Sequence, residues 1–349
     1  MLKMNRVFKH SLAALTLTSA LALSAQAAEV TLKVHHFLPK QAPAHKNFLM
    51  PWKEAVEKES NGRIEVKVYP AMQLGGKPPN LMDQVKDGFV DVVWTLPAYT
   101  PGRFPAISAF ELPFMITNAE ETSQALQEYY ETNKAVQDEF KDYHPLFFFT
   151  HDRGVIHTKN KTINNLADLK GLKIRIPSRP VADAMTAYGA VPVAMPIPQM
   201  PQALAKNVID GTVIPWEVVP AFRLHELAES STEIAGERGI YTSVFVFAMN
   251  KDKYNSLPAD LKKVIDNNSG MSWSKAMGKV WTDAEIPGRN MAQKRGNTLV
   301  TMPEADVAKM RDAAIGVHAA WVDEMNSKGL DGQALLDSAN ALANKYSSK

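Results

Sequence analysis

Hydrophobic and polar positions in the first part of the chain follow the period of a strand in some segments and that of a helix in others. Residues 30–35 and 64–69 alternate apolar and polar side chains, and residues 90–94 form a third strand-like segment. Apolar side chains at helical spacing lie between them, over residues 48–59 and 81–89. The order strand, helix, strand, helix, strand predicts an α/β unit with a largely parallel sheet.

A second α/β pattern begins near Leu172. We predict further strands at residues 146–149, 172–176, 191–195, 208–211 and 244–249, helices at residues 119–140, 181–188 and 198–206, and a mostly helical chain from Pro258 onward. Two such units predict an α/β fold of two lobes, with a ligand cleft beyond the carboxyl ends of the strands. We assign residues 28–150 and about 243–280 to lobe I, and residues 151–242 and about 281–349 to lobe II.

The first 27 residues have the pattern of a secretory signal peptide. Lys3, Arg6 and Lys9 precede an apolar segment at residues 12–23, and residues 25–27 supply the small-x-small pattern of a cleavage site. The apolar segment is too short to span a bilayer, and no stop-transfer pattern follows it. We therefore predict cleavage after residue 27 and a soluble periplasmic protein that is not anchored to a membrane.

Composition narrows the function classes further. The chain has 39 basic and 37 acidic residues, and the predicted signal peptide holds three basic residues and no acidic one, so the mature chain is close to neutral. This balance gives no case for a nucleic-acid partner. The absence of cysteine excludes a lipid anchor on cysteine, thiol catalysis and thiolate metal sites.

Motifs of enzymes and metal sites are missing. The chain has no Gly-x-Ser-x-Gly and no His-Glu-x-x-His, and the adjacent histidines 35 and 36 point to opposite faces of a strand. We predict no metal, no cofactor and no enzyme activity. A small molecule or another protein is the expected partner.

Arg175 is the side chain that most needs an explanation. In the strand at residues 172–176 the two-residue period puts it opposite Leu172, Ile174 and Ile176. An arginine inside a covered sheet is costly unless it meets an anion or forms a structural ion pair with a neighbouring carboxylate. Its planar guanidinium suits bidentate binding of a carboxylate.

The segment around Arg175 resembles the signature of the substrate-binding proteins of TRAP transporters, the DctP family. Residues 169–177 carry the resemblance, supported by residues 62–66, 84–91 and 209–211. The resemblance implies a two-lobed periplasmic solute-binding protein fold with a long interlobe helix. It also implies that the arginine at 175 binds a ligand carboxylate, and that the protein delivers its ligand to the membrane subunits of a TRAP permease. We expect a monomer.

The sequence departs from the family pattern at two polar positions. A second arginine is expected after the interlobe strand, where residues 155 and 156 are apolar, and His151, Arg153 and Arg179 are its candidate substitutes. Ile214 stands where an asparagine is expected.

Further candidates for the ligand site lie at predicted strand ends or near other motifs. They are the aromatic residues Trp94, Trp216 and Phe37, with Tyr99 and Phe114 as weaker candidates, together with His36 and Glu217. Glu217 is expected to be either a counter-charge to Arg175 or an acceptor for a ligand hydroxyl. The alternative for each tryptophan is ordinary core packing.

One arginine in a comparatively apolar pocket suits a monocarboxylate with a hydrophobic or aromatic body. Three alternatives stay open. The ligand could be an aliphatic dicarboxylate or a 2-oxo acid, the protein could serve an ABC importer or a sensor kinase, or the cleft could belong to a periplasmic hydrolase or isomerase.

Overall fold

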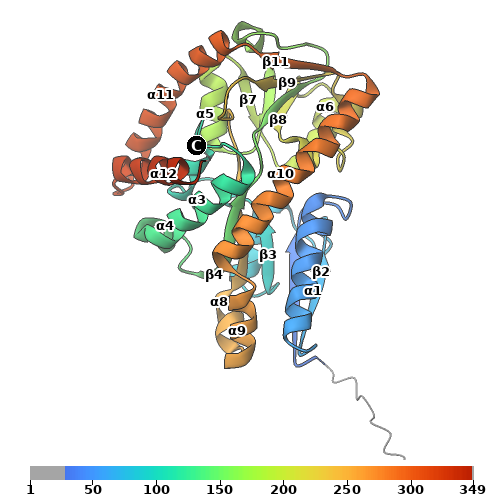
Figure 1. The fold of residues 1–349 in the computed structure, drawn as a ribbon, viewed down its shortest axis with the longest axis vertical. Helices are drawn as coiled ribbons and strands as arrows, with labels where there is room; N and C mark the ends of the chain where they lie inside the picture. The colour runs from blue at the N-terminus through green and yellow to red at the C-terminus, as the bar shows by residue number, and fades with distance from the viewer. Residues whose placement is uncertain (1–27, 348–349) are drawn as a thin grey trace, which may run out of the picture.

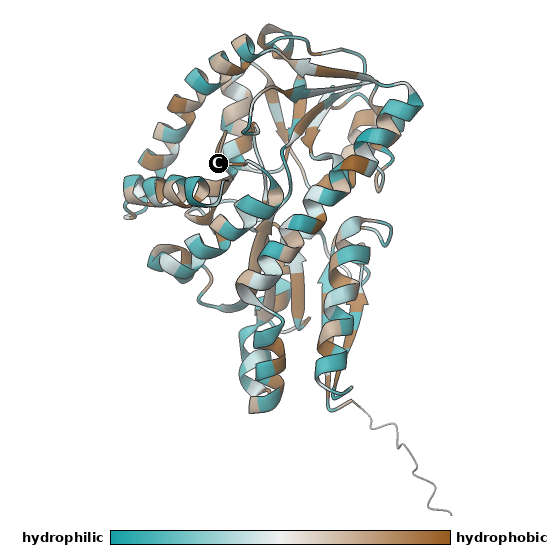
Figure 2. Ribbon diagram, in the orientation of Figure 1, coloured by the Kyte–Doolittle hydropathy of each residue, from teal (hydrophilic) through white to brown (hydrophobic). Residues whose placement is uncertain are grey.

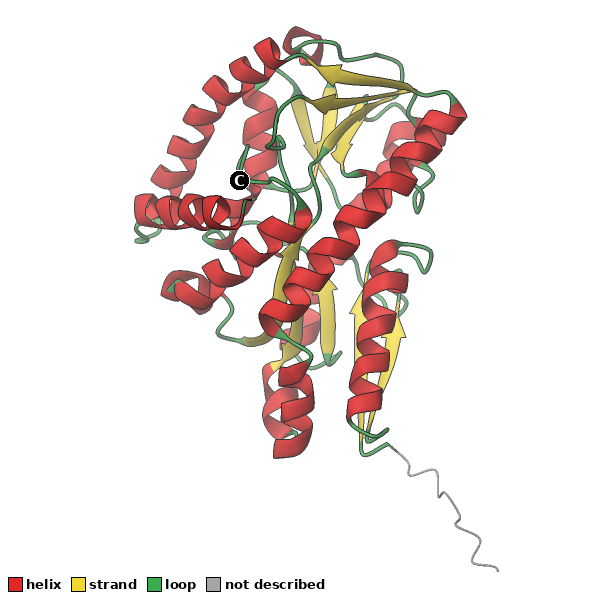
Figure 3. Cartoon of the chain, in the orientation of Figure 1, coloured by secondary structure: helices red, strands yellow, loops and turns green. Residues whose placement is uncertain are grey.

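The computed structural model describes residues 28–347, which form two β-sheets with helices packed around them (Figure 1). The predicted signal peptide and the last two residues lie outside this described part. The strands gather in two separate places, each flanked by helices (Figure 3). Within residues 28–347, no helix is both long and apolar enough to cross a membrane.

The first sheet has five strands in the order β2-β1-β3-β10-β4. They are β1 (Val30–His36), β2 (Ile64–Tyr69), β3 (Val92–Thr95), β4 (Tyr143–Thr150) and β10 (Val244–Asn250). β1, β2 and β3 are parallel as predicted, but β10 is antiparallel to both of its neighbours. The parallel pairing predicted for the first three strands is therefore confirmed, and the antiparallel β10 is an addition, made where the chain re-enters this sheet from the other lobe.

The second sheet has six strands in the order β11-β9-β5-β8-β6-β7. They are β5 (Val155–Thr158), β6 (Lys173–Ile176), β7 (Val191–Ala194), β8 (Gly211–Ile214), β9 (Ser230–Ile234) and β11 (Thr298–Met302). β6 lies parallel to β7 and β8, whereas β5 is antiparallel to β8 and β9. β6, which carries Arg175, is thus held on both sides.

Helices connect and cover the strands. The α-helices are α1 (Met50–Glu59), α2 (Leu81–Lys86), α3 (Ala119–Thr132), α4 (Lys134–Glu139), α5 (Arg179–Ala187), α6 (Met200–Ala205), α7 (Leu224–Leu227), α8 (Lys251–Ser256), α9 (Ala259–Asn267), α10 (Gly270–Arg295), α11 (Glu304–Ser327) and α12 (Gly332–Tyr346). Single turns that matter for the site are η3 (Pro97–Tyr99), η4 (Ile107–Glu111), η6 (Ile197–Gln199) and η7 (Trp216–Val218).

Three details correct the expected elements. The helix predicted at residues 119–140 is broken at Asn133, whose backbone is extended and whose side chain donates a hydrogen bond to the carbonyl of Tyr129. The strand predicted at residues 208–211 is wrong, because Asn207 turns the chain with a φ of 56° and β8 starts only at Gly211. The sequence pattern did not predict β5, β9 and β11, because these strands are only four or five residues long and include polar side chains.

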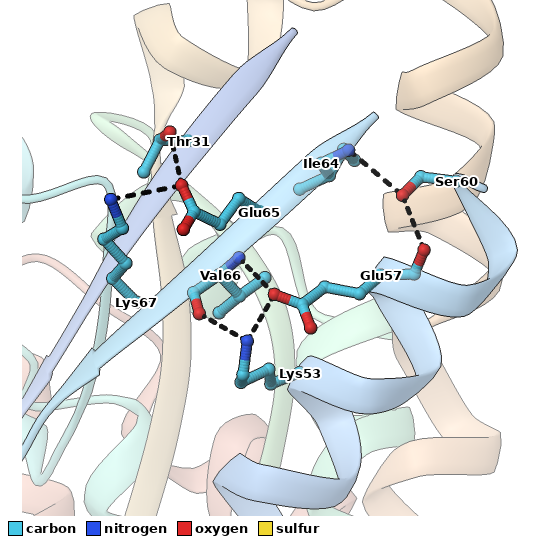
Figure 4. A network of polar contacts seen from close by, with 8 residues as sticks. All are labelled: Thr31, Lys53, Glu57, Ser60, Ile64, Glu65, Val66 and Lys67. Carbon is cyan, nitrogen blue, oxygen red and sulfur yellow. Dashed lines mark hydrogen bonds and ion pairs between the residues drawn. The ribbon is translucent and has the colours of Figure 1, made fainter. Parts of the chain in front are cut away.

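Side chains of α1 protect the open edge of β2 (Figure 4). The amide N–H of Val66 donates to a carboxylate oxygen of Glu57 over 2.8 Å, and Lys53 Nζ donates to the Val66 carbonyl over 2.9 Å. Lys53 and Glu57 also pair with each other. These bonds satisfy groups that an edge strand otherwise offers to another chain.

The buried apolar side chains form two clusters, of which the larger centres on the first sheet and extends to Val155 and Ile214 of the second. Hydrophobic residues are frequent along the strands of both sheets (Figure 2). The larger cluster is rich in aromatic side chains, with Phe48 edge-on to Phe247 at 5.0 Å and Trp52 edge-on to the same ring at 4.8 Å. The smaller cluster includes Ile174 and Ile176 of β6. Arg175 therefore faces away from this core, as the two-residue period predicted.

Helix α10 runs from the first lobe to the second (Figure 1). Two glycines allow the closest contacts. A Cβ atom on Gly278 would lie 2.4 Å from the carbonyl oxygen of Ala119, and one on Gly288 would lie 1.9 Å from that of Trp216. Ala119 opens α3 beside the first sheet, and Trp216 opens η7 after β8, so α10 is seated on backbone at both ends of the interlobe region.

Replacing Gly288 with alanine should push α10 away from η7. We expect Gly288→Ala to lower the free energy of unfolding by about 1–3 kcal/mol, because the added methyl group overlaps backbone that cannot rotate away. Gly316 in α11 is the matched control, since a Cβ atom there meets nothing within 4 Å. Gly316→Ala should be neutral or raise stability by up to about 1 kcal/mol. Urea unfolding measures both, and equal stabilities of the two variants would contradict this role of Gly288.

Candidate ligand-binding site

One small cavity lies where the carboxyl ends of β1, β3, β6 and β8 meet. The space between its walls, including the part open to solvent, is about 360 Å³. Its lining residues come from both lobes: Phe37, Leu38, Trp94, Leu96, Tyr99, His151, Arg175, Pro177, Ile197, Ile214, Pro215, Glu217, Val218, Tyr241, Ser243 and Phe245. Seven of the candidate site residues are thereby brought together, namely Phe37, Trp94, Tyr99, His151, Arg175, Ile214 and Glu217.

Arg175 is the buried cation of this cavity. Its side chain is only 2% exposed, and its Nε–H donates to the carbonyl oxygen of Met195 over 2.9 Å. Nη2 has no hydrogen-bond partner, and Arg175 forms no ion pair within residues 28–347. A buried guanidinium without a counter-charge is unfavourable, so this geometry is suited to receive an anion.

Aromatic rings form one wall. Trp94 is fully buried and stacks on Phe37, with ring centroids 5.0 Å apart and an interplanar angle of 13°. Phe245 lies 5.0 Å from Trp94 at a tilt of 38°, and Tyr99 stands edge-on to Phe37 at 5.6 Å. Offset and edge contacts of this kind also suit an added planar ring.

Glu217 lines the cavity but does not neutralise Arg175. It lies in η7, whose first two backbone N–H groups donate to the carboxylate of Glu285 in α10 over 3.0 and 2.8 Å. Burial raises the pKa of Glu217 to about 8, although the indole of Trp281 nearby acts in the opposite direction. No ion pair joins Glu217 to Arg175 in the described part of the chain, and burial favours the uncharged form of this carboxyl, so a counter-charge role in the empty state stays a prediction. The hydroxyl-acceptor alternative stays a prediction.

His151 contributes a neutral imidazole. Its Nδ1 bonds to the carbonyl oxygen of Asp152, and burial, with a smaller effect of Arg175, lowers its pKa to about 3. It therefore cannot replace the missing second arginine as a charged anchor. It remains a polar part of the wall.

His36 and Trp216 do not line the cavity. The Nδ1 atom of His36 accepts the N–H of Leu38, which leaves Nε2–H to donate to Nδ1 of His45 over 3.0 Å. The indole N–H of Trp216 donates to Glu233 over 2.9 Å, on the side of η7 away from the cavity. Both Trp216 and Glu217 were candidates for the site, but the 3₁₀ turn directs only Glu217 toward the cavity.

Arg153, Arg179 and Phe114 also lie elsewhere. Arg153 is exposed and donates to the carbonyl oxygen of Gly236 over 3.0 Å. Arg179 is exposed as well, and its Nη2 lies 3.4 Å from Glu324 at the rim of a separate, larger cavity between η4, α5 and α11. Phe114 packs under the guanidinium of Arg311. Neither arginine lines the cavity of Arg175.

The sequence analysis missed the segment just before β10 and the start of that strand. Tyr241, Ser243 and Phe245 line the cavity although no motif marked them. The predicted strand at residues 244–249 could have indicated them. The start of that strand follows the connection between the lobes, where the cleft was expected. Ile197 in η6 was missed because the turn after β7 has no polar marker. Within residues 28–347, no group of three potential ligands could hold a metal ion.

Comparisons with known proteins agree with this architecture. The family model of the bacterial extracellular solute-binding proteins, family 7, named DctP, matches residues 34–324. A marine metagenome TRAP solute-binding protein specific for aromatic acid ligands, solved with 3-hydroxybenzoate, is 49% identical with a TM-score of 0.90, covering 92% of this chain and all of that chain. A TRAP solute-binding protein from Rhodoferax ferrireducens, solved with copurified benzoate, is 48% identical with a TM-score of 0.89, covering 90% and 98% of the two chains.

A curated relative supports the same grouping. The outer membrane transporter protein TsaT of Comamonas testosteroni is 28% identical over 343 residues, which are 97% of this chain and 99% of the relative. The two-lobed α/β fold predicted from the sequence is confirmed by the solved structures. The chain therefore belongs to the DctP family, the substrate-binding proteins of TRAP transporters, as residues 169–177 predicted.

Proposed function

We propose that this protein binds a small aromatic monocarboxylate through Arg175, in the periplasm, and delivers it to the membrane subunits of a TRAP permease. The observation that carries the proposal is the buried guanidinium of Arg175, which has a free Nη2 and faces a cavity walled by Trp94, Phe37 and Phe245. The carboxylate supplies the missing counter-charge, and the ring packs among the aromatic side chains. The aromatic acids bound by the two solved relatives support this ligand class.

The charge of the cavity favours this ligand over the alternatives. An aliphatic dicarboxylate brings a second negative charge, and the cavity offers it no second cation, since Arg153 and Arg179 lie elsewhere. Glu217 is a neutral carboxyl that can exchange hydrogen bonds with a ring hydroxyl. Membership in a transport family argues against a hydrolase or isomerase, and against an ABC importer as the partner.

The lobes move about the interlobe segments in this proposal. Lobe I comprises residues 28–150 and about 243–280, and lobe II comprises residues 151–242 and about 281–349. Helix α12 is part of lobe II in this division, but it packs against α3 of lobe I, where Lys345 pairs with Glu128 over 2.6 Å. The chain acts as a monomer without a membrane anchor after the signal peptide is removed.

A panel of acids tests the ligand class. In thermal-shift measurements we expect benzoate, 3-hydroxybenzoate and phenylacetate to stabilise the protein, and succinate, pyruvate and glucuronate to have little effect. A ligand at about 100 times its Kd adds about 2.7 kcal/mol to the free energy of unfolding. Stabilisation by succinate alone would move the protein to the dicarboxylate class. Mass spectrometry of the recovered acid checks for turnover, which the proposal excludes.

Arg175→Lys tests the ion pair. Lysine keeps the charge but loses the planar fork, so we expect the Kd for benzoate to rise about ten- to one-hundred-fold. Titration calorimetry measures the change. Arg179→Lys is the matched control, because this arginine lies four residues away and outside the cavity, and its Kd should equal that of the wild type. Unchanged affinity in Arg175→Lys would mean that the arginine is structural.

Glu217 should make stability fall as the pH rises. Its pKa is 4.5 in the unfolded chain and about 8 in the folded protein, so the folded state holds a proton that the unfolded state releases between these values. The stabilisation is complete below the lower value and is lost as the pH rises through the upper one.

Glu217→Gln keeps the shape of the side chain but cannot become charged. The free energy of unfolding of this variant, relative to that of the wild type, should therefore increase by a few kcal/mol, as an order of magnitude, between about pH 5 and about pH 8. Urea unfolding at both pH values measures this, with Glu54→Gln on the surface as control. Parallel pH profiles of wild type and Glu217→Gln would contradict a neutral Glu217.

A further inference from the structure

Tyr99 brings a phenol from lobe I to the guanidinium of lobe II. It ends η3, directly after β3, and its side chain is 7% exposed at the wall of the cavity. The ring is held by the edge contact with Phe37 at 5.6 Å. The phenol thus lies on a fixed ring rather than on a mobile side chain.

The phenol oxygen of Tyr99 accepts a hydrogen bond, but its O–H group donates none within the described residues. Its oxygen accepts the backbone N–H of Ile197 in η6 over 3.1 Å, a bond between segments 98 residues apart that belong to different lobes. The guanidinium of Arg175 acts on the same phenol both through its charge and as a hydrogen-bond donor, because a guanidinium can only donate. The hydrogen bonds of residues 28–347 include no acceptor for the proton of the phenol itself.

That proton stays in place at neutral pH. Burial raises the pKa of Tyr99, and the charge of Arg175, which acts in the opposite direction, does not reverse this. Among the residues that line the cavity, the indole N–H of Trp94 has no hydrogen-bond partner. The O–H of Tyr99 and Nη2 of Arg175 are two further donors without acceptors. A carboxylate has acceptor sites for both.

We propose that Tyr99 is the second polar anchor of the ligand carboxylate, and that its bond to Ile197 couples carboxylate binding to closure of the two lobes. This inference rests on the proposed function and assigns the place of the second arginine that the sequence lacks. A neutral donor beside one guanidinium leaves a single positive charge, which matches a monocarboxylate.

The coupling follows from the position of the three groups. The phenol can accept from Ile197 only while lobe I lies against lobe II, and the ligand carboxylate then bonds Tyr99 of one lobe and Arg175 of the other. A bound carboxylate therefore makes contacts in the closed state that it cannot make in an open one, which is what a ligand needs in order to shift such an equilibrium.

Tyr99→Phe removes only the hydroxyl and keeps the ring. We expect the Kd for benzoate to rise about ten- to one-hundred-fold, as for the loss of a hydrogen bond to a charged group. Small-angle scattering of the benzoate-saturated variant should show less compaction than the saturated wild type. In the double variant with Arg175→Lys, the loss should be smaller than the product of the single losses, because both side chains bind the same group.

Tyr188→Phe is the matched control. Tyr188 is equally buried and its hydroxyl has no partner, but it lies in the core of the second sheet away from the cavity. Its affinity for benzoate should equal that of the wild type.

A Kd of Tyr99→Phe within about twofold of the wild type, which is less than the loss of a single hydrogen bond would cause, would overturn the role of Tyr99 as the second anchor. Full compaction of that variant at saturation would overturn the coupling to closure. Failure of the wild type to bind any aromatic acid would instead overturn the proposed function itself.

Discussion

The buried, unpaired guanidinium of Arg175 is the constraint around which the rest of the structure is arranged. An isolated charge in a protein interior is unfavourable by several kcal/mol, on the order of the whole stability of many domains. β6 can carry it because β7 and β8 hold the strand on both sides and because Ile174 and Ile176 are buried on the other face. The pairing with β7 and β8 and the burial of the two isoleucines thus offset the unfavourable free energy of placing one buried cation at the cavity.

Presenting that cation also requires the second lobe. The aromatic wall of the cavity belongs to β1, β3 and β10 of the first sheet, whereas Arg175 belongs to the second. α10 fixes how these parts can move, because Gly278 and Gly288 bring its backbone against one segment of each lobe. The connections between β4 and β5 and between β9 and β10 also cross from one sheet to the other. His151, Tyr241 and Ser243 lie in those connections and also line the cavity, so the proposed movement of the lobes would change the shape of the cavity.

Much of the first sheet and the central arginine could be predicted from the sequence, because both depend on local periodicity. The face of Arg175 follows from three alternating residues, and β2 has the bounds that its alternation indicates. The surroundings of the arginine could not be predicted in the same way. Trp216 and Glu217 are adjacent in the chain, and which of them faces the cavity depends on a 3₁₀ turn seated on Glu285, which lies 68 residues further along. His36 does not line the cavity, because its side chain bonds to His45, and no local sequence pattern predicts that bond.

The chemistry of the cavity depends on which of its groups are uncharged. Burial lowers the pKa of His151 to about 3 and raises that of Glu217 to about 8, and it raises the pKa of both Tyr99 and Tyr241. At neutral pH these four side chains are therefore neutral, although each could carry charge in water or at another pH. Arg175 is left as the single charge of the wall. A ligand with one negative charge is neutralised there, a second negative charge would be buried without a partner, and a neutral ligand would leave the guanidinium unpaired. Because a buried unpaired charge costs more than a lost apolar contact, the charge of the ligand is selected more strictly than the shape of its ring.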